Sequence, residues 1–167
     1  MEKLPKRAIP KILVLVALAG FAHAQFVDSG KQPGEKAQPV VYLFPEQVTV
    51  QAGKPSAVDL HFRVAQGLHI NSHTPSDRFM IATAFSIADS EGVKLSTTSY
   101  PPGEQFALDA DSNTKLSVYT GEFVIHAQIV ATAGNHIAQG KLRYQACDHS
   151  ECMPPKTIAV PIDVIAN

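Results

Sequence analysis

The chain has 167 residues, with 14 lysines and arginines against 15 aspartates and glutamates, and a net charge of −1 at pH 7. This balance argues against a nucleic-acid-binding protein, because such proteins present a basic face to the phosphate backbone. The length suits one domain with its own hydrophobic core. Only two cysteines occur, too few for a scaffold held together by disulfides.

The first 24 residues have the pattern of an export signal rather than of a folded element. A basic start is followed by the apolar run from Ile12 to Ala22, and Ala22-His23-Ala24 supplies a small-x-small cleavage site. The run is well short of the ~20 residues that a transmembrane helix requires. We therefore expect a signal peptide over residues 1–24 and a periplasmic protein, with a retained membrane anchor as the alternative. Residues 25–39, polar and rich in Gly and Pro, are expected to form a flexible leader.

From residue 40 onward the pattern is that of β-structure. Residues 58–64, 123–130 and 158–164 alternate between apolar and polar side chains, as half-buried strands do. Turn signals separate them from other segments of strand character, and no window offers a capped amphipathic helix. The further expected strands cover residues 40–50, 67–71, 79–88, 92–97, 115–119 and 139–146. This pattern predicts an all-β domain over residues 40–167, an immunoglobulin-like antiparallel β-sandwich, with a closed barrel as the competing layout.

Both cysteines lie in the segment of residues 142–155 (LRYQACDHSECMPP). A strand runs into Cys147, four polar residues follow, and after Cys152 two prolines end regular hydrogen bonding. We therefore expect both thiols at the turn of a hairpin, where opposed Cβ atoms lie about 4.5–5.5 Å apart, slightly more than the ~3.8 Å of a disulfide. A disulfide at this position can form and break with little backbone movement, as a redox shuttle requires.

The same pair is compatible with a static clamp, although closing so small a loop stabilises a fold by only about 2 kcal/mol. The four-residue spacing and the strand context differ from a thioredoxin-like site, where a helix N-terminus lowers the thiol pKa. Asp148 and Glu151 are expected to raise the pKa values of the thiols, with His149 opposing them. The pair is then expected to react mainly inside a docked complex.

Metal binding is the alternative from a different functional class. Cys147, His149, Cys152 and Met153 lie within a short stretch and are soft ligands suited to Cu(I). A periplasmic copper-binding protein is therefore the competing function; otherwise no cofactor beyond the redox-active disulfide is expected. His69 and His73 are either further side chains near the cysteines or polar loop residues.

Residues 144–147 (YQAC) followed by residues 152–155 (CMPP) closely resemble the N-terminal periplasmic domain of the transmembrane thiol-disulfide reductase DsbD. The resemblance covers roughly residues 40–167 and is specific at the hairpin. It implies an immunoglobulin-like, monomeric domain with thiol:disulfide interchange activity. Such a domain accepts electrons from a membrane-embedded thiol reductase and passes them to periplasmic thioredoxin-fold proteins. It further implies that Cys152 forms the mixed disulfide with partners and that Cys147 resolves it.

The chain also departs from the family pattern. Its loop between the cysteines has four residues where the best-known members have five. His69 and Asn71 stand where those members place tyrosines, and residues 106–114 (FALDADSNT) are expected to hold the aromatic cap loop that shields the disulfide. The chain ends at Asn167, so donor and acceptor are expected to be separate chains. The expected site-flanking residues are Tyr144, Gln145, His149, Met153, Pro154, His69, Asn71 and Phe106, the last being the only aromatic candidate for the cap.

Overall fold

The computed structural model describes residues 38–43, 47–88, 92–108 and 111–167. The chain divides into two compact units, Met1–Glu35 and Lys36–Asn167, and all the described residues belong to the second. The expected signal peptide and nearly all of the expected leader lie outside the described residues, so both stay predictions. Within the described ranges, no helix has the length and apolar character needed to cross a bilayer.

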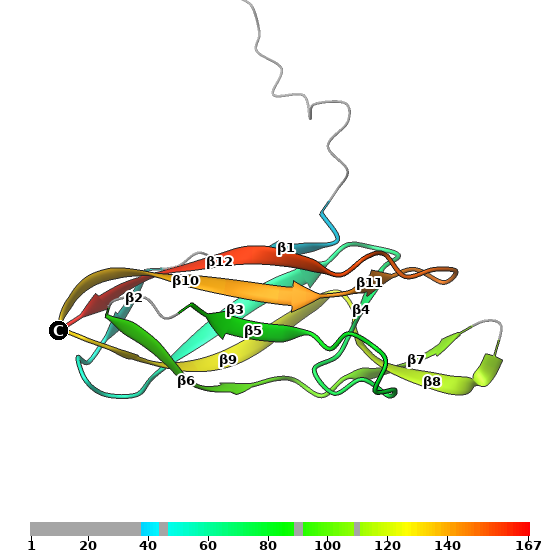
Figure 1. Ribbon diagram of the computed structural model, residues 1–167, viewed down its shortest axis with the longest axis horizontal. Coiled ribbons are helices and arrows are strands. Elements are labelled where there is room, and N and C mark those ends of the chain that lie inside the picture. Colours follow the sequence, from blue (N-terminus) through cyan, green and yellow to red (C-terminus); the bar gives the residue numbers. More distant parts are fainter. Residues whose placement is uncertain (1–37, 44–46, 89–91, 109–110) are drawn as a thin grey trace, which may run out of the picture. The chain divides into compact units, whose positions relative to one another are not determined.

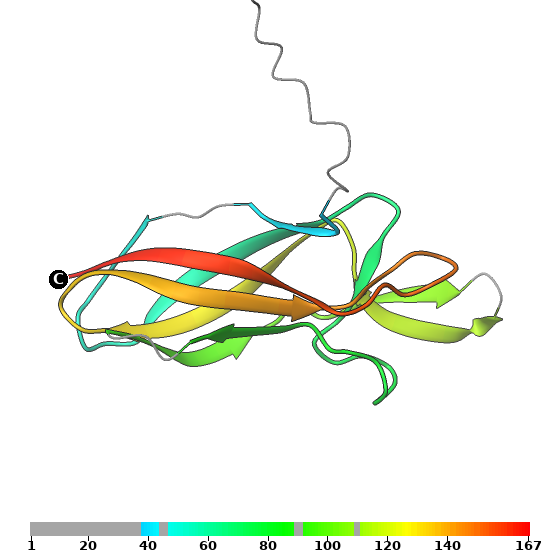
Figure 2. The ribbon, with the colours of Figure 1, turned by 45° about the horizontal axis from the view of Figure 1, so that its top comes forward.

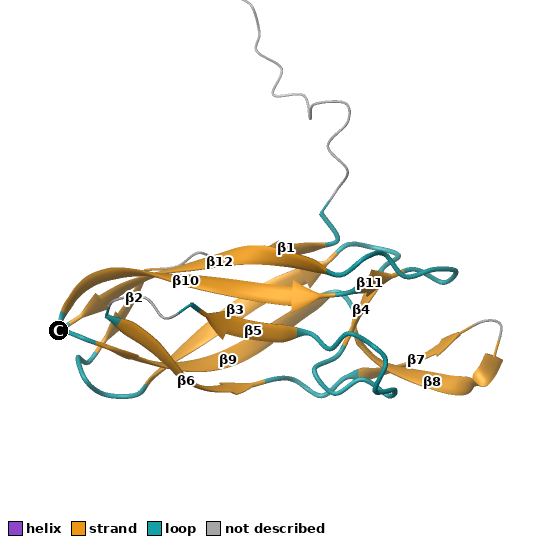
Figure 3. Ribbon diagram, in the orientation of Figure 1, coloured by secondary structure: helices purple, strands orange, loops and turns teal. Residues whose placement is uncertain are grey.

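Two four-stranded sheets form a sandwich (Figures 1 and 3). The first sheet has the order β1-β3-β9-β6 and the second the order β2-β12-β10-β5. In the first sheet the strands are β1 (Val40–Tyr42), β3 (Ser56–Val64), β9 (Glu122–Ala131) and β6 (Val93–Ser99). In the second sheet they are β2 (Gln47–Val50), β12 (Lys156–Ala166), β10 (Gly134–Tyr144) and β5 (Ala84–Ile87). The strand pairs of the sandwich are antiparallel except β2 with β12, which is parallel.

The strand order identifies the sandwich as immunoglobulin-like. In such a fold strands A, B, E and D form one sheet and C, F and G the other. Strands β1, β3, β9 and β6 take the places of A, B, E and D, and β5, β10 and β12 those of C, F and G. Both sheets end in separate edge strands instead of closing on themselves, so the barrel alternative is excluded. The expected fold class is therefore confirmed.

The hydrophobic core lies between the two sheets, because every second side chain of each strand points inward. On β3 and β9, Leu60 is paired with Ile125 and Phe62 with Phe123, and three of these four side chains are 0% exposed. The rings of Phe62 and Phe123 stack with their centroids 5.3 Å apart. Full burial of each such side chain contributes about 1.5–3 kcal/mol. The sandwich is thus held by its core.

A smaller sheet of order β11-β4-β8-β7 lies at the end of the sandwich opposite the C-terminus (Figures 1 and 2). Its strands come from three separate connections. Strand β4 (His69–Asn71) follows strand B, the hairpin of β7 (Glu104–Leu108) and β8 (Asp111–Tyr119) joins D to E, and β11 (Ala146–Cys147) joins F to G. The B–C and F–G connections leave an immunoglobulin-like sandwich at the same end. Residues far apart in the sequence therefore meet around the cysteines.

Two expected strands were wrong in extent. The segment of residues 40–50 is divided between β1 and β2, which belong to different sheets, and the sequence carries Pro45, which has no amide donor, between them. Of residues 79–88 only β5 is a strand. The backbone just before β5 bonds to the β4 region instead, since Thr83 N donates to Ser72 O at 3.2 Å and Asn71 Nδ2 donates to Ile81 O at 3.1 Å.

Residues 106–114 were expected to hold a cap loop, but the described part of this segment forms strands. Apart from residues 109–110, which lie outside the described residues, this segment belongs to the β7–β8 hairpin, with Phe106 paired to Leu116. The resemblance to the family placed a loop here. The strands form because β7 and β8 pair with each other, since β-propensity depends on the neighbouring strand more than on the residues themselves.

Candidate functional site

The two cysteines close the tip of the β10–β12 hairpin. Cys147 forms an isolated antiparallel bridge with Cys152, and their sulfurs form a disulfide with the Cα atoms 4.0 Å apart. The pairing continues with a hydrogen bond of 2.8 Å from Met153 N to Ala146 O. The expected disulfide at a hairpin turn is therefore confirmed.

The two halves of this disulfide differ in exposure. Cys147 is 2% exposed, whereas Cys152 is an exposed residue. Cys147 is covered because it has a neighbour on each edge, His69 of β4 on one side and Cys152 on the other. A thiol approaching from solvent therefore reaches Cys152 first.

The four-residue loop between the cysteines is ordered by the carboxylate of Asp148. Its Oδ1 accepts hydrogen bonds from Ser150 N (2.7 Å), Ser150 Oγ (2.8 Å) and Glu151 N (2.8 Å). These bonds favour the ionised form and lower the pKa of Asp148 to about 2. The loop therefore carries a fixed negative charge next to Cys147 at neutral pH.

Strand β4 reaches Cys147 through a tight turn that requires glycine. Leu68 N donates to Ala65 O at 3.1 Å, and Gly67 has a φ of 81°. A positive φ at the third residue is characteristic of a type II turn, and residues other than glycine adopt it only with strain. The turn redirects the chain from β3 into β4 and places His69 directly opposite Cys147.

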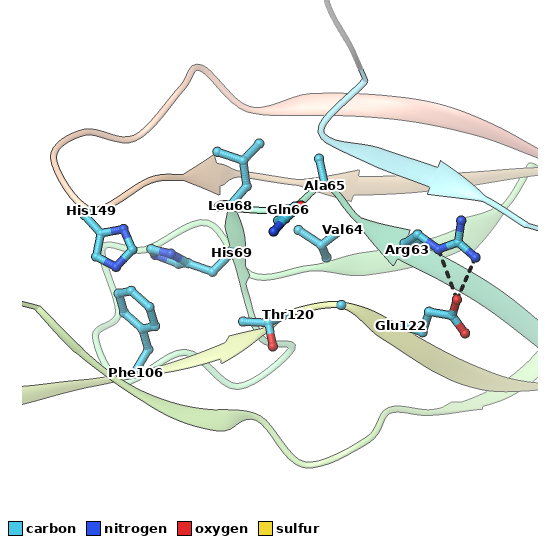
Figure 4. Close-up of a pocket in the computed structure, with 12 residues that line it drawn as sticks. Arg63, Val64, Ala65, Gln66, Leu68, His69, Phe106, Thr120, Glu122 and His149 are labelled. Carbon is cyan, nitrogen blue, oxygen red and sulfur yellow. Dashed lines mark hydrogen bonds and ion pairs between the residues drawn. The ribbon is translucent and has the colours of Figure 1, made fainter.

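Three of the expected site residues come together beside the disulfide. The ring of Phe106, from β7, lies 4.2 Å from the ring of His69 and 5.3 Å from that of His149, centroid to centroid. His69 is 1% exposed and His149 is exposed. Figure 4 shows Phe106 and the two imidazoles grouped at one end of a pocket. The hairpin thus supplies the aromatic side chain that the sequence assigned to a cap loop.

This pocket, with a volume of about 500 Å³, is the part of the site that the sequence did not predict. Its walls include Leu68, His69 and Phe106, and the far end holds an ion pair of 2.7 Å between Arg63 and Glu122 (Figure 4). The residues come from β3, the turn after it, the start of β4, β7, the turn between β8 and β9, the start of β9 and the cysteine loop. The Gly67 turn was the one sequence signal for it, because a sharp turn there brings β4 alongside the other connections.

His69 is held as a neutral imidazole. Burial lowers its pKa, the neighbouring His149 lowers it further, and Asp148 opposes both effects. No hydrogen-bond partner for the buried Nε2 lies among the described residues. A buried nitrogen without a partner is costly and uncommon in folded proteins.

Asn71 and Gln145 tie the segment after Cys152 to the sandwich. Asn71 is 2% exposed and donates through Nδ2 to Ile81 O (3.1 Å) and to Gln145 Oε1 (3.4 Å). Gln145 Nε2 in turn donates to Met153 O at 3.2 Å. The two amides therefore fix the backbone of the residue next to Cys152.

Substitution Asn71→Ala is expected to destabilise the domain by about 1–3 kcal/mol, because Ile81 O and Gln145 lose a buried donor. Urea denaturation measures the loss. Asn135→Ala, which removes the same side chain from an exposed position of β10, is the matched control and is expected to stay within about 0.5 kcal/mol of the wild type. Equal effects of the two substitutions would contradict a structural role for the amide network.

The remaining expected site residues pack in the core, are exposed, or contact residues other than the cysteines. Tyr144 is 1% exposed and belongs to the sandwich core, where burial raises the pKa of its phenol. Met153 is half-buried and packs against the core, and Pro154 is exposed. His73 stacks on Tyr100 with ring centroids 3.7 Å apart, and one ring nitrogen lies 2.9 Å from Thr83 O.

The ligand set expected for copper is not assembled. Among the described residues no group of three or more His, Cys, Asp and Glu side chains could hold a metal ion. Both sulfurs of Cys147 and Cys152 are engaged in the disulfide, and Met153 packs against the core.

Comparison with known proteins assigns the chain to a family. The sequence profile described as "Thiol:disulfide interchange protein DsbD, N-terminal" matches residues 40–163. The DsbD N-terminal domain of Neisseria meningitidis in its reduced form is 20% identical, with a TM-score of 0.44, over 70% of this chain and 82% of that chain. The complex between the DsbD N-terminal and PilB N-terminal domains from Neisseria meningitidis gives 19% identity and a TM-score of 0.42, over 66% of this chain and 77% of that chain.

No curated protein matches the chain. The family profile, however, covers well over half of it, including the small sheet, the cysteine hairpin and most of the sandwich. The chain belongs to the family of the N-terminal domain of the thiol:disulfide interchange protein DsbD.

Proposed function

We propose that the domain transfers electrons by thiol–disulfide exchange through Cys147 and Cys152 in the bacterial periplasm. Its donor is a membrane-embedded thiol reductase, and its acceptors are thioredoxin-fold proteins. The observation that carries the proposal is the asymmetry of the pair, in which an exposed Cys152 is joined to a buried Cys147. Membership of the family supports interchange chemistry in general.

Reduction of the domain starts at the exposed sulfur. A donor thiolate attacks Cys152 Sγ, the Cys147–Cys152 bond breaks, and its electron pair and a proton go to Cys147. The second donor thiol then displaces Cys152 from the mixed disulfide, so that the donor leaves oxidised and the domain holds two thiols. Attack at Cys147 is disfavoured because that residue is buried.

Reoxidation reverses the roles. The thiolate of Cys152 attacks the disulfide of an acceptor and forms a mixed disulfide with it. Cys147 then attacks Cys152 Sγ, restores the internal disulfide and releases the acceptor as a dithiol. Because the Cα atoms are already 4.0 Å apart on one hairpin, this closure requires little backbone movement.

Phe106 and His149 restrict the approach to the pair from the side of the pocket. Their rings pack together, and Phe106 also covers His69 opposite Cys147. A partner that approaches Cys147 from that side has to displace Phe106, whereas Cys152 is open to solvent.

The reduction potential of the pair tests the proposal. The purified domain is equilibrated in glutathione redox buffers, and free thiols are trapped by alkylation. A potential above about −300 mV is expected, since exchange disulfides are less reducing than structural ones. A value well below that limit contradicts the proposal and marks a structural bond. The double variant Cys147→Ser/Cys152→Ser is the control for unspecific alkylation.

A further inference from the structure

His69, Cys147 and Cys152 are consecutive neighbours across the small sheet. His69 is directly opposite Cys147 in the antiparallel pair of β4 and β11, and Cys147 is opposite Cys152 in the bridge on its other edge. Residues directly opposite in an antiparallel pair have their side chains on the same face, with Cβ atoms about 4.5–5.5 Å apart. The imidazole therefore stands beside Cys147 on the side away from Cys152.

The exchange reaction requires a proton acceptor next to the Cys147 thiol. Cys147 must lose its proton to attack Cys152, because the thiolate and not the thiol is the nucleophile. An unperturbed thiol is only a few per cent thiolate at neutral pH, and burial lowers that fraction further. Solvent has little access to Cys147, which is 2% exposed.

His69 has the properties of such an acceptor. It is neutral, and its buried Nε2 has no hydrogen-bond partner among the described residues. The ring of Phe106 packs against it at a tilt, with the ring centroids 4.2 Å apart, and keeps it in place. A buried ring nitrogen without a partner in the disulfide state is explained if it accepts a thiol proton that exists only in the reduced state.

The charged groups around His69 fit this role. Asp148 on the cysteine loop favours the protonated imidazole, whereas His149 on the same loop opposes it. Across the pocket, Arg63 and Glu122 neutralise each other in an ion pair of 2.7 Å. The imidazolium formed by proton uptake is therefore stabilised chiefly by the Asp148 carboxylate.

We propose that His69 takes up the proton of Cys147 when Cys147 resolves the mixed disulfide on Cys152. This assignment rests on the proposed exchange function. In the step, the Cys147 S–H bond breaks and its proton moves to His69, the thiolate forms a bond to Cys152 Sγ, and the bond from Cys152 to the partner breaks. The electron pair leaves with the partner sulfur as a thiolate, which takes a proton from solvent, and the His69 imidazolium later gives its proton to solvent. In the opposite direction His69 returns the proton to Cys147 as it departs.

Dithionitrobenzoate separates the two steps, because each displacement releases one coloured thionitrobenzoate anion. The reduced domain first attacks the reagent through Cys152, in a phase whose rate depends on reagent concentration. Cys147 then displaces the second anion in an intramolecular phase. The first phase reports on the exchange function, and the second reports on His69.

In the wild type we expect the rate of the second phase to be independent of pH from just above the lowered pKa of His69 up to the pKa of the thiol. In His69→Phe, which keeps an aromatic ring against Phe106, the rate is expected to rise tenfold per pH unit over the same range. At neutral pH it is expected to be about 30-fold lower, the reciprocal of a thiolate fraction of a few per cent.

His69→Ala provides an independent measurement with the same domain. Because the pocket opens next to the deleted ring, added imidazole is expected to accelerate the second phase of His69→Ala in proportion to its neutral form. It is not expected to accelerate that of His69→Phe, where the ring fills the space. His126→Ala, which removes an exposed histidine on β9 whose Nδ1 lies 2.7 Å from Asp59 Oδ1, is the control and is expected to behave as the wild type.

The outcomes separate the two proposals. An unchanged pH profile in His69→Phe, or no acceleration of His69→Ala by imidazole, overturns the role of His69 and leaves the exchange function intact. Absence of either phase in the wild type overturns the exchange function itself. Urea unfolding of each variant identifies any that is not folded, and a loss of rate without rescue in a folded His69→Ala also counts against proton uptake.

Discussion

Cys147→Ser is expected to accumulate as a covalent complex with its redox partners, and Cys152→Ser is not. In Cys147→Ser the exposed Cys152 still attacks a partner disulfide, but no second thiol is present to displace the partner. In Cys152→Ser the remaining sulfur is buried beside His69 and reacts slowly. Both single variants are expected to lose catalysed exchange completely, because each lacks the internal disulfide.

Periplasmic extracts separated on gels without reductant detect these complexes, and reductant is expected to release them. The double variant Cys147→Ser/Cys152→Ser is the background control. Trapping on Cys152→Ser with equal or greater yield would reverse the roles that we assign to the two cysteines. Absence of complexes from both single variants would instead favour the static clamp.

The sequence predicted the features that depend on local pattern. The alternation of Leu60 and Phe62, and of Phe123 and Ile125, indicated half-buried strands, and these residues pair across β3 and β9. The hairpin position of Cys147 followed from the strand before it and from the two prolines after Cys152. Such features require only a strand period and turn residues, which a single sequence contains.

The features that the sequence did not predict depend on contacts between distant segments. Phe106 lies in the segment that the resemblance assigned to a cap loop, and it is part of the β7–β8 hairpin, whose inner strand β8 pairs with β4 from a distant part of the chain. The pocket requires Arg63, Leu68 and Phe106 to meet, which follows only from the immunoglobulin-like order of the strands. Tyr144 illustrates the opposite case, since the motif drew attention to it and the structure places it in the core.

The position of His69 connects the fold with its chemistry. In sequence terms it was expected, from the resemblance to the family, to stand in place of a tyrosine, which by itself indicates nothing about proton transfer. The register of β4 against β11 places it opposite Cys147, and the burial of the ring keeps it neutral. A phenylalanine at this position could cover Cys147 but could not accept its proton, so exchange in this domain is expected to depend on pH differently from exchange in His69→Phe.

Leu142→Ala is expected to destabilise the domain by about 2–5 kcal/mol, more than removal of the disulfide does. Leu142 is 0% exposed in the central strand β10, with Phe85 of β5 and Ile158 of β12 on either side, so truncation leaves a cavity in the core. The disulfide closes a loop with a sequence separation of 5, for which loop entropy contributes only about 2 kcal/mol. Since domains of this size have about 5–15 kcal/mol of stability, the reduced form is expected to stay folded.

Urea unfolding midpoints of Leu142→Ala, of the double variant Cys147→Ser/Cys152→Ser and of the wild type measure the two losses. Arg143→Ala, at the exposed neighbouring position of β10, is the matched control and is expected to change stability by less than about 0.5 kcal/mol. A shuttle must pass repeatedly through its dithiol state without unfolding, so the exchange function requires the double variant to be folded in the absence of urea. If the double variant is unfolded without urea, the bond is a structural clamp, and a domain that unfolds on reduction could not carry electrons between partners.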